Sequence, residues 1–156
     1  LIALAKARPG DLSYASSGNF LYLSGALFTS MAKVKMLHVP FKGGSQAMPA
    51  VVAGEVGLSF ATIVSSLPLV EANKLRGLAI TASKRSPAVD LPTVAESGVP
   101  GYNVDQMYGI IGSAKIPKPI INKINAGIVT ALKDPETVKK LVADGSNPVG
   151  STPEAY

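Results

Sequence analysis

Short β-like runs alternate with segments of helical periodicity over the first half of this chain, and this alternation constrains the fold more than any other feature of the sequence. Each run is rich in apolar residues, and turn residues separate it from the helical segment that follows. The predicted strands are 12–15, 36–39, 56–60 and 77–81. The predicted helices between them are 20–31, 45–53 and about 64–71, and residues 1–7 resemble the last turns of an earlier amphipathic helix. This order of elements predicts βαβ crossovers and a mainly parallel sheet.

The expected fold class is therefore α/β, an open sandwich in which helices cover both faces of the sheet. A chain of 156 residues with 47% hydrophobic and 16% charged residues can bury a substantial core. Asn19 is expected to cap the helix that starts at Phe20. Ser45 is expected to cap the next helix, which Gly54 closes.

The character of the sequence changes after Ser83, where proline and glycine recur through the weakly periodic stretch 87–101. This stretch is interpreted as a crossover between two lobes. Beyond it, the pattern predicts a strand at 108–112 and helices at 117–133 and 135–144. Ser151, followed by Thr-Pro-Glu, predicts the start of another helix, because proline is favoured just after a helix cap.

Composition excludes several classes of protein. The formal net charge is +5, but apart from the adjacent pair Lys139 and Lys140 the basic residues are scattered, so no nucleic acid partner is expected. No apolar stretch is long enough to predict a membrane span. The chain has no Cys and one His, and its acidic residues lack metal-binding spacing, so neither a metal nor another cofactor is expected.

The strand-to-helix junctions are the expected ligand sites. In a parallel sheet, ligands bind beyond the carboxyl ends of the strands, where the helix N-termini present free N–H groups. The first junction, Ser16-Ser17-Gly18-Asn19, offers two hydroxyls and a glycine that permits close approach to the backbone. An ordinary capped loop explains this tetrapeptide about as well as a ligand site does.

Two further junctions are weaker candidates. Lys42-Gly43-Gly44-Ser45 could bind an anion through its backbone with a cation beside it, although a flexible turn with a solvated lysine is the favoured interpretation from the residues alone. It is not a nucleotide-binding P-loop, because its lysine precedes the glycines. The third junction, Ala61-Thr62, offers one hydroxyl at the end of a buried strand.

His38 is the only histidine, so any reaction that needs an imidazole must use it. It lies inside an apolar β-like run, where a packed and hydrogen-bonded histidine is more common than a catalyst. A hydrolase built on Ser16 or Ser17 with His38 would also need an orienting acid and an oxyanion hole, and the sequence contains no G-x-S-x-G motif. The chain is therefore expected not to be an enzyme.

Several segments, taken in order, resemble the tripartite tricarboxylate transporter substrate-binding proteins, also called Bug proteins. The first segment reads KARPGDLSYASSG and the second reads HVPFKGG. The matching segments are 6–18, 38–44, 91–98, 133–135 and 148–154. They are spread over essentially the whole chain.

The resemblance implies a periplasmic-binding-protein fold of type II, with two α/β lobes around a cleft. Residues 1–10 would be the end of a first-lobe or hinge helix, 11–105 the second lobe, and 106–156 a segment that returns to the first lobe. It also implies a periplasmic receptor, monomeric at full length, that captures a small organic carboxylate for a membrane permease. The family's serine-glycine loop corresponds to Ser16 to Asn19.

The sequence departs from the family pattern in three ways. The family's N-terminal part, with its proline-glycine-glycine ligand loop and export signal, is expected to be missing. Phe41 stands where many relatives have Tyr, and Ala61 stands where many have Asp. If that Asp binds a ligand amino group, Ala61 favours a plain acid over an amino acid.

Two other function classes stay open from the sequence. The effector-binding domain of a transcription regulator can have the same two-lobed fold. A small serine hydrolase that uses Ser17 and His38 would show turnover of an activated ester.

Overall fold

The computed structural model describes residues 1–143 and 145–155. The chain forms two compact units, Leu1–Gln106 and Met107–Tyr156, and each is described by itself. The predicted assignment of chain segments to the two lobes of a receptor remains a prediction.

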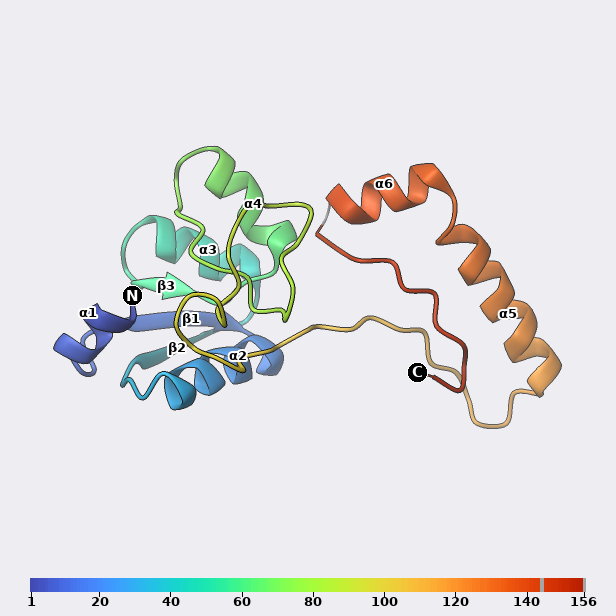
Figure 1. Cartoon of the computed structure of the whole chain (residues 1–156), viewed down its shortest axis with the longest axis horizontal. Coiled ribbons are helices and arrows are strands. Elements are labelled where there is room, and N and C mark those ends of the chain that lie inside the picture. Colours follow the sequence, from blue (N-terminus) through green and yellow to red (C-terminus); the bar gives the residue numbers. More distant parts are fainter. Residues whose placement is uncertain (144, 156) are drawn as a thin grey trace. The chain divides into compact units, whose positions relative to one another are not determined.

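The first unit is built on a three-stranded parallel sheet (Figure 1). The strands are β1 (Ser13–Ser17), β2 (Leu37–Phe41) and β3 (Leu58–Ser59), in the order β2-β1-β3. In the register of the sheet, Tyr14 of the central strand lies opposite His38 on one side and Leu58 on the other. The predicted α/β class with a parallel sheet is confirmed, and three of the four predicted strands are present with shifted ends.

Helices cover both faces of this sheet. The helices of the first unit are α1 (Ile2–Ala7), α2 (Asn19–Met31), α3 (Gly44–Val52) and α4 (Ile63–Glu71). Figure 1 shows α2 on one face of the sheet and α3 on the other. Because successive side chains of a strand point to opposite faces, β1 supplies both cores. Tyr14 packs with Phe28 of α2, and Ala15 packs with Met48 of α3.

The segment that follows α4 contributes to the core beside α2. Tyr102 is 1% exposed, and its hydroxyl donates a hydrogen bond of 2.9 Å to the carbonyl oxygen of Ser24. Burial raises the pKa of Tyr102 to about 12, because the charged phenolate would lose its hydration. Val94 and Val99 join the same core cluster. This largely irregular stretch is therefore anchored by apolar burial.

The predicted strand at 77–81 is wrong. The structure has only an isolated parallel bridge between Ile80 and Thr93 there. The N–H of Ile80 donates to Pro92 and the N–H of Val94 donates to Ile80. The ladder does not extend further, in part because Pro92 has no N–H to donate.

The predicted caps are also wrong in both helices. Asn19 is the first helical residue of α2, and the N-cap is Gly18, whose φ of 85° an L side chain rarely adopts. In α3 the N-cap is Gly43, so Ser45 lies inside the helix. Neither helix has a side-chain cap hydrogen bond among the described residues. Glycine at the N-cap leaves the first N–H groups of each helix without a side-chain acceptor.

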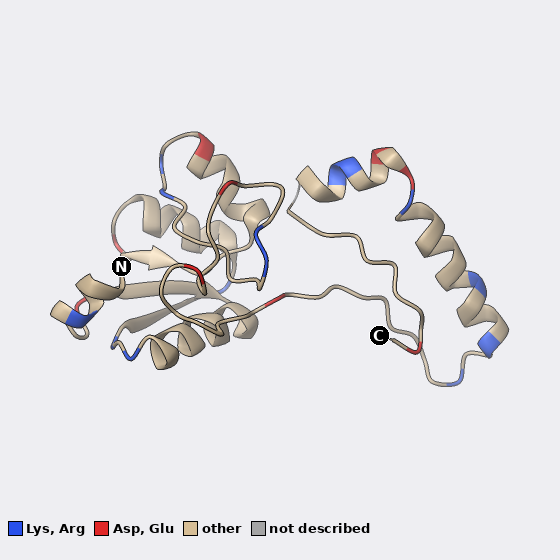
Figure 2. Cartoon of the chain, viewed as in Figure 1, with Lys and Arg blue, Asp and Glu red and all other residues tan. Residues whose placement is uncertain are grey.

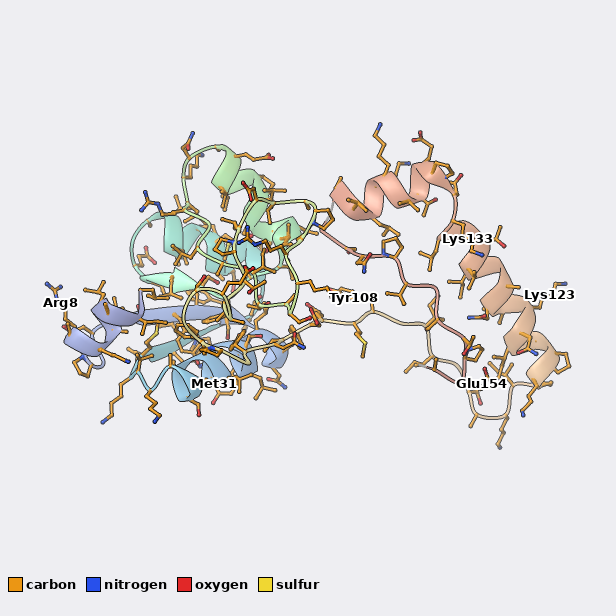
Figure 3. The ribbon with its side chains drawn as sticks, viewed as in Figure 1. Arg8, Met31, Tyr108, Lys123, Lys133 and Glu154 are labelled. Carbon is orange, nitrogen blue, oxygen red and sulfur yellow. The ribbon has the colours of Figure 1, made fainter. Side chains whose placement is uncertain are left out.

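The second unit contains α5 (Lys118–Ala131) and α6 (Pro135–Ala143). The two helices predicted here are confirmed, except that the last predicted residue, Asp144, lies outside the described part of the chain. The side chain of Asn125 donates a hydrogen bond of 2.9 Å to the carbonyl oxygen of Ser151, which ties the following segment to α5. Figure 3 labels Lys123 on α5 and Lys133 just after the end of this helix.

The predicted strand at 108–112 is wrong, whereas the helix predicted to start at Ser151 stays a prediction. Residues 108–112 are extended but pair with no strand in the described structure, and Tyr108 and Ile111 are 76% and 83% exposed (Figure 3). A β-prone sequence forms a strand only when a neighbouring strand offers hydrogen bonds. After Ser151 the chain forms a turn, in which the N–H of Ala155 donates to Thr152.

Within the described residues, none of the helices is both long and apolar enough to cross a membrane.

Candidate functional site

The carboxyl ends of the three strands lie at one edge of the sheet, because all three are parallel. Each strand runs into a helix at this edge, β1 into α2, β2 into α3 and β3 into α4. The three strand-to-helix junctions predicted from the sequence are therefore all present. The three junctions differ in the surface feature or contact that each forms.

A cavity of about 390 Å³ opens at the first junction. We call it the Ser16 cavity. Its lining residues come from β1, the start of α2, and β2: Ser16, Gly18, Asn19, Tyr22, His38, Pro40 and Phe41. This volume lies within the range typical of small-molecule sites.

Ser16 and His38 form the polar centre of this cavity. Ser16 is 2% exposed, and its Oγ lies 2.7 Å from Nε2 of His38. The imidazole ring packs against two tyrosine rings, with centroid distances of 5.1 Å to Tyr14 and 4.7 Å to Tyr22. The sequence-based interpretation of His38 as a packed, hydrogen-bonded residue is confirmed, and the structure adds that it faces the cavity.

The first turn of α2 lies at the edge of the Ser16 cavity, where Gly18 and Asn19 line it. The N–H of Tyr22 donates to the carbonyl oxygen of Gly18, and this bond closes the first turn of the helix. The N–H groups before Tyr22 have no acceptor within the helix. They carry the partial positive charge of a helix N-terminus, which favours an anion.

The lining of the Ser16 cavity is formally neutral. None of the described residues that line it is Asp, Glu, Lys or Arg. Figure 2 shows the Lys and Arg positions spread over helices and loops of both units. An anion in the cavity would therefore meet hydroxyl, imidazole and backbone donors, without repulsion from a carboxylate in the lining.

The second junction belongs to a different depression. Gly44 and Ser45 line a groove of about 530 Å³ between α3 and α4, where Met48 and Leu69 contribute apolar walls. Lys42 is exposed, and neither it nor Gly43 is among the described residues that line the Ser16 cavity. The structure therefore separates Lys42 to Ser45 from the Ser16 cavity.

At the third junction, the Thr62 hydroxyl contacts a nearby side chain of α4. Thr62 precedes α4, and its Oγ1 lies 3.0 Å from Oγ of Ser65. Ala61 packs against the core cluster around Met48. Neither Ala61 nor Thr62 is among the described residues that line the Ser16 cavity.

Of the first junction's four predicted residues, Ser16, Gly18 and Asn19 line the cavity, whereas Ser17, the last residue of β1, does not appear in its described lining. The sequence analysis missed four lining residues: Tyr22, His38, Pro40 and Phe41. Strand order could have identified the three that lie in β2, because consecutive parallel strands are often neighbours. Tyr22 lies in the first turn of α2, next to the predicted Asn19.

A comparison with family models matches residues 1–155 to the family described as tripartite tricarboxylate transporter family receptor. A Pseudomonas sp. protein encoded in the tcbD–tcbE intergenic region is 34% identical over 158 residues, which is 99% of this chain and 47% of that protein. The chain spans about half the length of the curated relatives it matches.

Solved structures agree with this match. A structure of an R. palustris protein with adipate has a TM-score of 0.87 and 32% identity, and the alignment covers 99% of this chain and 52% of that one. The structure of MatC from Rhodopseudomonas palustris with bound malate has a TM-score of 0.76 and 30% identity, covering 92% of this chain and 50% of that one. The predicted periplasmic-binding-protein-like fold is thereby confirmed.

Proposed function

Since this chain belongs to the family of tripartite tricarboxylate transporter receptors, we propose that it binds a small organic carboxylate in the Ser16 cavity. The observation that carries the proposal is the convergence of the Ser16 hydroxyl, His38 and the N-terminus of α2 on one cavity without an acidic residue in its described lining. Carboxylates are bound well by such donors, because each of their oxygens accepts hydrogen bonds.

The relatives supply the class of ligand. One solved structure contains adipate and another contains malate, both small carboxylates. We propose a ligand of the same class, with one carboxylate against Ser16 and the first N–H groups of α2. The junctions at 42–45 and 61–62 are proposed to contact more distant parts of the ligand.

The proposed cellular role follows from the family. The protein would act in the periplasm as a receptor, not as an enzyme, and deliver its ligand to the permease of a tripartite tricarboxylate transporter. We propose that 11–105 forms one lobe around the ligand and that 106–156 belongs to the other, with 1–10 at the hinge. Affinity in such receptors is shared between two lobes that close around the ligand.

Isothermal titration calorimetry with adipate tests the proposal. The wild-type chain should bind adipate and should not bind adipamide, its uncharged diamide. Ser16→Ala should weaken binding by about 10- to 100-fold, since a hydrogen bond to a charged group contributes about 1.5–3 kcal/mol. Malate, titrated in parallel, tests whether a shorter dicarboxylate that carries a hydroxyl group binds as well as adipate.

Ser30→Ala is the matched control. Ser30 is an exposed residue near the other end of the same helix, α2, so its loss should leave the affinity for adipate unchanged. Equal affinity for adipate in the wild type and in Ser16→Ala would show that the carboxylate does not bind at this junction. Equal affinity for adipate and adipamide would rule out anion recognition.

The short contact between Ser16 and His38 favours a second candidate, a serine hydrolase. Of the two serines considered from the sequence, Ser16 and Ser17, the structure brings Ser16 to the imidazole. Efficient Ser-His catalysis also needs a carboxylate that orients the imidazole, and none of the described residues supplies a carboxylate hydrogen bond to His38. The receptor function therefore fits the cavity better.

A further inference from the structure

The hydrogen bond between Ser16 and His38 determines whether the Ser16 hydroxyl can donate a hydrogen bond to a ligand. A serine hydroxyl has one hydrogen to donate and two lone pairs to accept with. Nε2 of His38 lies 2.7 Å from Oγ, so one of these capacities is used by the imidazole. The remaining capacity is available to a ligand in the Ser16 cavity, which both residues line.

The two possible directions of this bond have opposite consequences for a ligand. If Nε2 accepts the hydroxyl hydrogen, Ser16 presents only lone pairs to the cavity, and these repel a carboxylate. If Nε2 carries a hydrogen and donates it to Oγ, the hydroxyl hydrogen is free to point at the ligand. In a neutral imidazole only one nitrogen carries hydrogen, so the tautomer of His38 sets the direction.

We propose that His38 is a positioning residue for ligand recognition: its Nε2–H donates to Ser16 and thereby commits the Ser16 hydroxyl as a donor to an anionic ligand oxygen. This inference rests on the proposed carboxylate binding in the Ser16 cavity. It adds a residue to the site that acts through Ser16.

The packing around His38 fits such a role. The ring packs against Tyr14 and Tyr22, and Tyr14 is itself 3% exposed. β2 carries His38 and β1 carries Ser16, and these two strands pair directly. The paired strands and the two aromatic contacts hold the imidazole near Ser16.

The arrangement also predicts selectivity. A hydroxyl that donates its hydrogen to the ligand favours the group whose oxygen accepts hydrogen bonds most strongly. A charged carboxylate oxygen accepts more strongly than the neutral oxygen of an amide, and an amide nitrogen does not accept at all. The Ser16–His38 pair should therefore favour adipate over its monoamide, in which one carboxylate is replaced.

Two substitutions of His38 separate donation from packing. His38→Gln places an amide N–H close to the position of Nε2, whereas the shorter side chain of His38→Asn ends near the position of Nδ1. We expect about tenfold weaker adipate binding in His38→Asn, as for the loss of one hydrogen bond, and recovery of most of that loss in His38→Gln. Calorimetry with adipate gives both values.

A double-mutant cycle distinguishes positioning from a purely structural role. If His38 acts through Ser16, His38→Asn should cost about tenfold in wild type but almost nothing in the Ser16→Ala background. Equal losses in both backgrounds would overturn the proposal. So would unchanged affinity in His38→Asn. The absence of adipate binding in every variant, the wild type included, would instead refute the proposed function together with this inference.

The tautomer can be observed directly in the unmutated chain. In mildly alkaline buffer with saturating adipate, long-range ¹H–¹⁵N NMR of histidine-labelled protein should show a protonated nitrogen at Nε2 and an unprotonated one at Nδ1. The His38→Gln sample identifies the resonances by their disappearance. An unprotonated Nε2 in the adipate complex would overturn the proposal even if adipate binds tightly.

Discussion

Gly25 of α2 faces Tyr14, and alanine at this position should destabilise the protein and disturb the Ser16 cavity. A Cβ atom added to Gly25 would lie 2.8 Å from both Cδ2 and Cζ of Tyr14, closer than real Cβ contacts come. Tyr14 has no open space to move into, because it is 3% exposed and packs edge-on against Phe60 at 5.6 Å and tilted against His38 at 5.1 Å.

Two terms set the size of the effect. Overpacking a filled core costs about 1–3 kcal/mol. Replacing glycine by alanine inside a helix returns about 1 kcal/mol of helix propensity. Because these two terms oppose each other, we expect Gly25→Ala to lower the free energy of unfolding by up to about 2 kcal/mol, which corresponds to a fall in Tm of up to roughly 8 °C for a chain of this size.

Differential scanning calorimetry measures the fall in Tm, and Gly127→Ala is the control. Gly127 lies in α5, is exposed, and has no atom within 4 Å of an added Cβ, so alanine there gains propensity without a clash. Adipate affinity should fall in Gly25→Ala, because a displaced Tyr14 shifts His38, and should stay unchanged in Gly127→Ala. A Gly25→Ala protein as stable as Gly127→Ala would refute the packing argument.

Three further predictions concern Tyr102, Tyr108 and Ser16. Tyr102→Phe removes the hydrogen bond to Ser24 and should lower the unfolding free energy by about 1–2 kcal/mol. Because the pKa of Tyr102 is raised to about 12 in the folded state from 10.0, wild-type stability should decline as pH rises from 10 through 12, and urea titrations of Tyr102→Phe should show a smaller decline. Tyr108→Ser, at a side chain that is 76% exposed, should change stability by less than about 0.5 kcal/mol by the same titration. p-Nitrophenyl acetate should be hydrolysed no faster by wild type than by Ser16→Ala. Faster hydrolysis by the wild type would support the serine hydrolase function.

The sequence predicted those helices that are marked by a local pattern of apolar residues or prolines. The helices α2, α5 and α6 were predicted because apolar spacing or flanking prolines mark them. The strands at 77–81 and 108–112 failed because a strand is defined by its partner, which local sequence does not contain. Thus Ile80 forms one bridge, and Tyr108 is extended without a described neighbour.

The candidate site was only partly predicted, because local sequence does not show which residues strand pairing brings together. Ser16, Gly18 and Asn19 are adjacent in sequence, so one junction motif identified them together. His38 was assessed alone, and its role depends on a residue 22 positions earlier that only strand pairing brings within 2.7 Å. The Gly18 N-cap was missed because its φ of 85° is a backbone property, while Asn19 looked like the better capping side chain.

The most direct test of carboxylate binding in the Ser16 cavity is an amide NMR titration with adipate. A carboxylate at the N-terminus of α2 should shift the backbone N–H resonances of residues 18–21 most strongly, since these groups would donate to it. The resonances of α5 and α6 should change little. Saturable shifts centred on residues 18–21 would support the account, and shifts elsewhere with none at this junction would contradict it.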